Sequence, residues 1–231
     1  MTPRETLELA EWRRRIADLY ARVRKVATHD PEAAWEDWRA TRETLFREHP
    51  QSPVPAEARG AFRAWHWPYD PALRLEGVVQ PDAPTETDVM AEPDVTAGPA
   101  SVAASLRGLA MLVPISTGGG ESLERIGTIR VPFASGERRL GLYWMSGYTG
   151  GLFLPFRDAT NGNETYGAGR YLLDAAKSAD LGPGRAPGSL VLDFNFAFQP
   201  SCAFDPKWAC PLAPPENRLD LRIEAGERLA A

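Results

Sequence analysis

The segment Gly151–Asp174 reads GLFLPFRDATNGNETYGAGRYLLD, and it decides the fold class. Its two ends are rich in apolar and aromatic residues, and between them stands Asn161-Gly162, a pair that accepts the positive φ of a tight turn. The pattern predicts a β-hairpin with arms at Gly151–Phe156 and Thr165–Leu173. Strands joined by so short a connection run antiparallel. The segment therefore favours an antiparallel sheet.

The chain on both sides of this hairpin continues the same pattern. From Gln51 onward, short apolar segments alternate with turn residues, whereas β-α units would place long helical segments between the strands. The predicted strands are Leu73–Gln80, Leu109–Ile115, Gly127–Phe133, Arg138–Met145, Gly151–Phe156, Thr165–Leu173, Ser189–Asn195 and Leu219–Ala225. Between the first two lies the acidic segment Pro81–Pro99, which has no basic residue and for which we expect a mobile loop. We predict a β-barrel or β-sandwich of about eight strands.

The first 50 residues have helical periodicity instead. A capping box at Thr2–Glu5 begins one predicted helix, and Asp30-Pro31 begins a second that ends at His49-Pro50. We therefore predict an α+β fold that is mainly antiparallel β, with a helical hairpin at 1–50 packed on a β domain at 51–231.

Composition narrows the possible partners. The 231 residues include 26 basic and 31 acidic ones, for a net charge of -5. Because no excess positive charge is available to neutralise phosphates, we expect neither nucleic acid nor a membrane surface as partner. No apolar run approaches the roughly 18 residues of a membrane span, and the N-terminus lacks the apolar segment of a signal peptide. We expect a cytoplasmic protein, in which two cysteines are more often free than bridged. The oligomeric state stays open.

Unusual motifs occur between Phe156 and Arg218. They are FRDATNGNETYGAGRYL at Phe156–Leu172, LDFN at Leu192–Asn195, CAF at Cys202–Phe204, CPL at Cys210–Leu212 and PPENRL at Pro214–Leu219. Together they resemble the family catalogued as domain of unknown function 1684, which comprises uncharacterised bacterial and archaeal proteins. The resemblance extends more weakly to Trp38–Pro53 and Pro68–Pro71, and the chain looks like the short, actinobacterial-type version. It implies no activity, so any chemistry must be inferred from the residues.

Four polar residues on two predicted strands form the main candidate site. Alternation places Tyr166 and Arg170 on one face, about 13 Å apart, and Asp193 and Asn195 on one face of the next strand, about 7 Å apart. If Asp193 lies buried opposite Arg170, the two form a costly charge pair of the kind that is commoner at functional sites.

The first hypothesis is therefore a small-molecule site, with or without catalysis, in the mouth of the barrel. Arg170 would bind an anionic group of the ligand, Tyr166 and Asn195 would orient it, and Asp193 would act as acceptor or general base. The further candidate ligand-binding residues are Arg157, Asp158, Asn161 and Asn217. The alternative is an interaction or structural module in which the same polar groups form a buried network that stabilises the fold.

The two cysteines support a third hypothesis. Cys202 and Cys210 lie in a proline-rich segment, which predicts an extended loop. They could be buried structural thiols or a disulfide, a reactive redox pair, or metal ligands. Zinc would need two more ligands, and the histidines lie far upstream without ligand spacing, so we expect no metal. No nucleotide-binding motif is present, and we expect no cofactor. The third hypothesis is a thiol redox protein.

Overall fold

The computed structural model describes residues 1–82, 110–118, 120–145 and 150–230. All but the first two residues of the predicted acidic loop at 81–99 therefore lie outside the described residues. Within the described part of the chain, no helix has the length and apolar character needed to cross a bilayer.

Two antiparallel helices form the N-terminal hairpin, as predicted. Helix α1 is Pro3–Val26 and helix α2 is Pro31–Glu48. Thr2 and Glu5 form the reciprocal capping box of α1, while the Asp30 side chain accepts a hydrogen bond from the Ala33 N–H at the start of α2. Short polar residues at both N-termini thus satisfy backbone donors that the helices leave unpaired.

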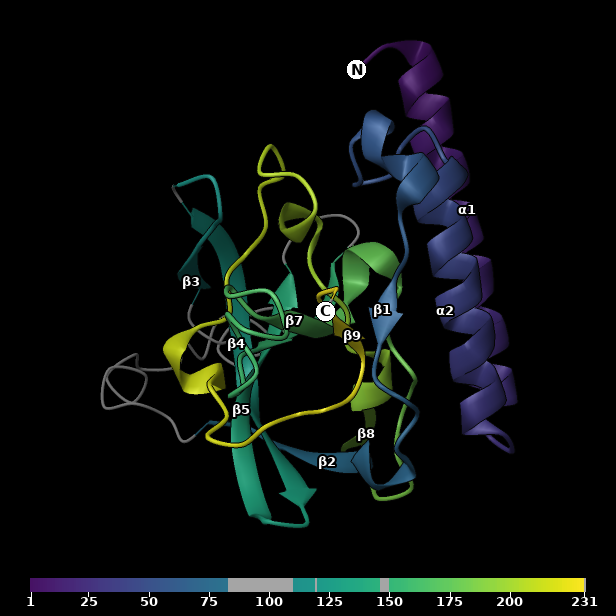
Figure 1. Ribbon diagram of the computed structural model, residues 1–231. Helices are drawn as coiled ribbons and strands as arrows, with labels where there is room; N and C mark the ends of the chain where they lie inside the picture. Colours follow the sequence, from purple (N-terminus) through teal and green to yellow (C-terminus); the bar gives the residue numbers. More distant parts are fainter. Residues whose placement is uncertain (83–109, 119, 146–149, 231) are drawn as a thin grey trace, which may run out of the picture.

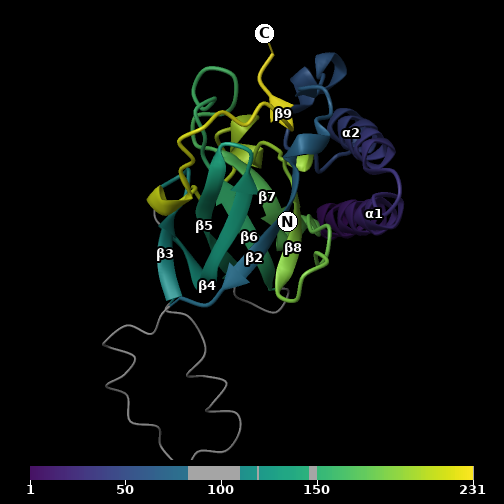
Figure 2. The ribbon, with the colours of Figure 1, turned by 90° about the horizontal axis from the view of Figure 1, so that it is seen from below.

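The rest of the chain forms a curled antiparallel sheet, which confirms the α+β, mainly antiparallel fold. Seven strands run in the order β7-β6-β5-β4-β2-β8, with β3 paired to β4. They are β2 Arg74–Gln80, β3 Ala110–Pro114, β4 Gly120–Phe133, β5 Gly136–Met145, β6 Gly151–Phe156, β7 Arg170–Asp174 and β8 Ser189–Asp193. A second sheet pairs β1, Trp65–His66, with β9, Glu227–Arg228. The large sheet curls into half a barrel, and the helices lie on the flank that carries β1 and β8, far from β3 (Figures 1 and 2).

Short 3-10 helices occupy several of the connections. They are η1 Ala56–Ala61, η2 Pro71–Leu73, η3 Ala175–Lys177, η4 Phe194–Phe196, η5 Ser201–Ala203 and η6 Pro215–Asn217. Helix η4 shortens the predicted strand 189–195, because the Asp193 side chain accepts the Asn195 N–H and turns the chain out of the sheet.

The hairpin between β6 and β7 is present, with Phe156 paired to Arg170. Gly162 has the expected positive φ of 87°. The prediction of a strand from Thr165 is wrong, however, because β7 begins only at Arg170. The Asn161 amide donates to Thr165 Oγ1 and to the Tyr166 carbonyl, so a side chain takes the place of a strand partner there.

The predicted strand Leu219–Ala225 is also wrong, although its alternation identified the buried face. Leu219, Ile223 and Ala225 are buried, as expected. The first half of this segment bonds to the backbone that follows β6, since the Leu219 N–H donates to the Arg157 carbonyl and the Leu221 carbonyl accepts the Ala159 N–H. Farther along, side chains take this role: the Ile223 N–H donates to Asp158, and the Ile223 carbonyl accepts from Arg170. The segment is therefore held by a few backbone hydrogen bonds near Leu219 and by charged side chains near Ile223.

The helical hairpin shares a core with the sheet. One cluster of buried apolar residues combines Leu19 and Trp38 of the helices with Phe196 and Phe198 of the β region. A buried ion pair joins the same parts, since Arg42 of α2 donates to both carboxylate oxygens of Glu227 in β9, at 2.5 and 3.0 Å. These contacts bring α2 to the edge of the small sheet.

Candidate functional site

Arg170 lies at the start of β7 and has no exposed surface. Its guanidinium donates to the carbonyls of Ile223, Ala225 and Glu227 and forms an ion pair with Asp158 at 3.4 Å. Burial lowers the pKa of Arg170, and the Asp158 charge partly offsets this effect. The three carbonyl contacts fasten β9 and the segment that precedes it, and the ion pair ties Arg170 to the turn after β6. Arg170 thus pairs with Asp158 and not with Asp193, contrary to the arrangement considered from sequence.

Asp193 and Asn195 form a separate buried network. The Asp193 carboxylate accepts hydrogen bonds from Arg74 at 3.0 Å, from the Tyr69 hydroxyl at 3.2 Å, and from the backbone and side chain of Asn195. Burial raises the pKa of Asp193, although these donors oppose the shift. The Asn195 amide exchanges two hydrogen bonds with the Asp70 backbone. The network therefore holds η4 against the chain before β2.

The other predicted ligand-binding residues also bond to the protein's own backbone. Asn217 bridges β5 and β6, because its amide bonds to both backbone groups of Gly141 and to the Pro155 carbonyl. Arg157 donates to the Gly167 carbonyl, and Asn161 organises the loop between β6 and β7. The structure thus distributes the candidate residues among several local networks.

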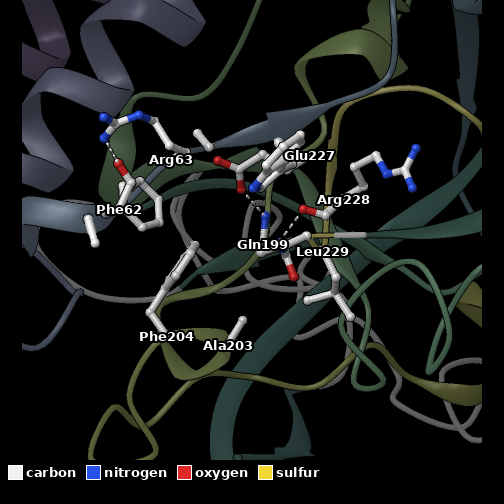
Figure 3. Close-up of a pocket in the computed structure, with 12 residues that line it drawn as sticks. Phe62, Arg63, Gln199, Ala203, Phe204, Glu227, Arg228 and Leu229 are labelled. Carbon is white, nitrogen blue, oxygen red and sulfur yellow. Dashed lines mark hydrogen bonds between the residues drawn. The ribbon is translucent and has the colours of Figure 1, made fainter. Parts of the chain in front are cut away.

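A cleft of about 390 Å³ lies between the small β1–β9 sheet and helices η1 and η5. Its lining residues are Ala61, Phe62, Arg63, Ala64, Trp65, Gln199, Ala203, Phe204, Glu227, Arg228, Leu229 and Ala230. Figure 3 shows Gln199 at the centre, with Phe62 and Arg63 on one side and Arg228 and Leu229 on the other. The lining includes none of the candidate site residues predicted from sequence.

Two buried polar side chains, Gln199 and Glu227, belong to this cleft. Burial favours the protonated form of Glu227, but the charge and hydrogen bonds of Arg42 outweigh it and lower the pKa of this carboxyl. The Gln199 amide donates to the Arg228 carbonyl at 3.3 Å, and its Oε1 has no hydrogen-bond partner among the described residues. A buried amide oxygen without a partner is uncommon in native proteins.

Two cationic side chains line the rim of the cleft, and Figure 3 shows their guanidinium groups directed outward from Gln199. Arg63 bonds to the Phe62 carbonyl, and the Arg228 guanidinium lies 5.2 Å from the centre of the Trp67 ring. Within the described parts of the chain, neither arginine pairs with a carboxylate. Sequence reasoning missed Gln199 and Glu227 because each is an isolated polar residue. They meet only in the fold, where the Gln199 N–H donates to the Glu227 carboxylate at 2.7 Å.

The two cysteines are free and buried, and they lie in contact with each other. The Cys202 N–H donates to Cys210 Sγ at 3.3 Å. Cys202 is part of η5, and Cys210 is held beside the end of β3 by a hydrogen bond from its N–H to Ser116 Oγ, at 3.0 Å. Tyr166, predicted to join Arg170, instead packs in the cluster that contains the thiols.

Comparison with known proteins settles the family. Residues 63–228 match the model of the family described as "Protein of unknown function (DUF1684)". The chain belongs to the DUF1684 family. A similar solved structure is the solution NMR structure of an uncharacterised protein of Haloarcula marismortui, with 26% identity, a TM-score of 0.57, and coverage of 87% of this chain and 96% of that one. None of the curated proteins compared with the chain matches it.

The DUF1684 match runs from one side of the cleft to the other. It begins at Arg63 and ends at Arg228, and it includes both thiols and every candidate residue predicted from sequence. Helix α2, which supplies Arg42, precedes it. The family assignment confirms the resemblance seen in the motifs and leaves the function to be inferred from the geometry.

Proposed function

We propose that this DUF1684 protein binds a small anionic or polar molecule in the cleft between β1, β9, η1 and η5. The observation that carries the proposal is a cavity of about 390 Å³ in which the buried Gln199 amide keeps an unpaired oxygen. Small-molecule sites are typically about 300–1,000 Å³, with mostly apolar walls and a few polar groups that orient the ligand.

The lining residues suit a ligand with a flat apolar body and an anionic group. Phe62 and Phe204 provide apolar walls, and their rings contact each other edge to face at 5.7 Å. Arg63 and Arg228 supply positive charge, and a guanidinium matches the geometry of a carboxylate or phosphate. Glu227 is neutralised by Arg42, so it does not cancel that charge.

For the buried polar residues predicted from sequence we propose a structural role. Arg170, Asp193 and Asn195 each bond to other groups of the protein, and Arg170 Nε alone among their side-chain donors has no partner within the described residues. A network of this kind stabilises one backbone arrangement, and removal of one member leaves others unpaired. The proposed ligand site therefore lies at the small sheet and not in the mouth of the barrel.

The test is a thermal-shift and calorimetric titration with benzoate and phenyl phosphate as probes. A probe at 100 times its dissociation constant stabilises the folded state by about 2.7 kcal/mol, which raises the melting temperature by several degrees. Gln199→Leu and Arg228→Gln should reduce that shift, whereas Gln51→Leu, a glutamine change outside the cleft, should preserve it. Absence of binding by both probes, or binding that the two cleft variants leave unchanged, contradicts the proposal.

A further inference from the structure

The contact between the two thiols has a specific geometry. Cys202 and Cys210 are eight positions apart, and the chain between them bends so that Cys210 Sγ accepts the Cys202 N–H at 3.3 Å. Cys210 is anchored on both sides, because its N–H donates to Ser116 Oγ and its carbonyl accepts the Ser116 N–H, each at 3.0 Å. The sulfur atoms are therefore held together by the fold.

The donors around the sulfur atoms make the two thiols different. The Cys210 thiol and the Tyr166 hydroxyl hydrogen-bond with Cys202 Sγ, whereas the nearby Ser116 hydroxyl donates to the Trp208 carbonyl at 2.8 Å. These bonds, with that of Cys210 the strongest, outweigh burial and lower the pKa of Cys202 to about 6. The pKa of Cys210 is raised, because the Cys210 thiol donates a hydrogen bond to Cys202 and is buried. These shifts favour the thiolate form of Cys202 and the protonated thiol form of Cys210.

The surroundings also limit what can reach the pair. Cys202 is 6% exposed and Cys210 is 7% exposed. Tyr166, which is only partly buried, contributes its hydroxyl at Cys202. Such low exposure favours a small oxidant over a bulky disulfide, since exchange with a disulfide requires access along the sulfur–sulfur axis.

We propose that Cys202 and Cys210 form a redox-active dithiol that reduces a small hydroperoxide, with Cys202 as the attacking thiolate and Cys210 as the resolving thiol. This activity is separate from ligand binding in the cleft.

The proposed reaction has two balanced steps. Cys202 Sγ attacks the outer oxygen of the hydroperoxide and breaks the O–O bond; the alkoxide or hydroxide leaves with a proton, and Cys202 becomes a sulfenic acid. Cys210 Sγ then attacks the sulfenic sulfur, a disulfide forms, and water leaves with the Cys210 proton. Overall, two thiols and one hydroperoxide give one disulfide, one alcohol or water, and one further water. A dithiol reductant restores the starting state.

The experiment uses the reduced full-length protein and hydrogen peroxide as the probe. One equivalent should remove both titratable thiols and lower the intact mass by about 2 Da through one Cys202–Cys210 disulfide, and dithiothreitol should reverse the change. Cys210→Ser should stop at the sulfenic acid, which dimedone traps. Cys202→Ser should react with peroxide at least about tenfold more slowly, because the remaining thiol is protonated at neutral pH.

Several outcomes would overturn the proposal. Two thiols that resist peroxide in the folded protein and react only after unfolding are inert structural cysteines. Equal peroxide rates for the two single-cysteine variants would refute the assigned roles. Tyr166→Phe should shift the pH profile of the wild-type reaction upward, and Gln199→Leu should leave the peroxide reaction unchanged, which separates this activity from binding in the cleft.

Discussion

Replacement of Arg170 by methionine should destabilise the protein severely, because Arg170 is a structural cation. The change removes the donors to the Ile223, Ala225 and Glu227 carbonyls and leaves the buried Asp158 carboxylate without its ion-pair partner. Removal of one partner from a buried pair typically costs about 3–5 kcal/mol, and each buried carbonyl left unpaired adds about 1–3 kcal/mol.

Adding the smallest values of these two contributions, we expect Arg170→Met to lower the free energy of unfolding by at least about 4 kcal/mol. In a protein of this size, 1 kcal/mol shifts the melting temperature by about 2–4 °C, so the variant should melt roughly 8–16 °C below the wild type. Urea unfolding followed by circular dichroism measures the free energy, and differential scanning calorimetry measures the melting temperature.

The matched control is Arg222→Met, in the segment whose carbonyls Arg170 binds. The Arg222 side chain is 47% exposed, and it pairs with Glu164 and Glu224 at the surface. Exposed ion pairs contribute about 0–1 kcal/mol, so this variant should stay within a few degrees of the wild type. If Arg170→Met lowers the free energy of unfolding by less than about 1 kcal/mol, the structural role of the guanidinium is refuted. The hypothesis that Arg170 binds a ligand would then be the better explanation.

Four further predictions follow from individual contacts. Asn217→Ala should cost about 2–4 kcal/mol in urea unfolding, since three hydrogen bonds between β5, β6 and η6 are lost. Gly169→Ala should destabilise far more than Gly182→Ala in the same assay: both glycines have positive φ, but only at position 169 would a Cβ meet a carbonyl oxygen, at 2.5 Å. The pKa of Glu227 is lower in the folded state than its usual value of 4.5. The ionised carboxylate therefore stabilises the fold fully above pH 4.5, and this stabilisation is lost as pH falls through the folded pKa. The free energy of unfolding of Glu227→Gln should depend less on pH between about 5 and 3 than that of the wild type. Alkylation of Cys202 by iodoacetamide should have its midpoint at about pH 6, and a midpoint above 8 would refute the assigned thiolate.

Local patterns in the sequence predicted several features that the structure confirms. The capping residues Thr2 and Asp30 begin the two helices, and Gly162 adopts the positive φ of its turn. Alternation in Leu219–Ala225 identified the buried face of that segment. Each of these features depends on residues within a few positions of one another, so the sequence carries the necessary information.

Which groups pair was decided by the tertiary structure alone. Leu219–Ala225 reads as a strand, but Arg170 and Asp158, which lie 53 and 65 positions from Ile223, take the backbone hydrogen bonds of that residue. The cleft likewise depends on Arg42 and Glu227, which are 185 positions apart.

The sequence by itself thus determined the family motifs, the two helices, most of the strands and most of the buried face. The choice of Asp158 rather than Asp193 as partner of Arg170, and the contact between Cys202 and Cys210, were decided only by the folded structure. The physical reason is that periodicity along the chain specifies the direction of a side chain, whereas hydrogen bonds and ion pairs depend on distances in space, which vary with how distant segments pack.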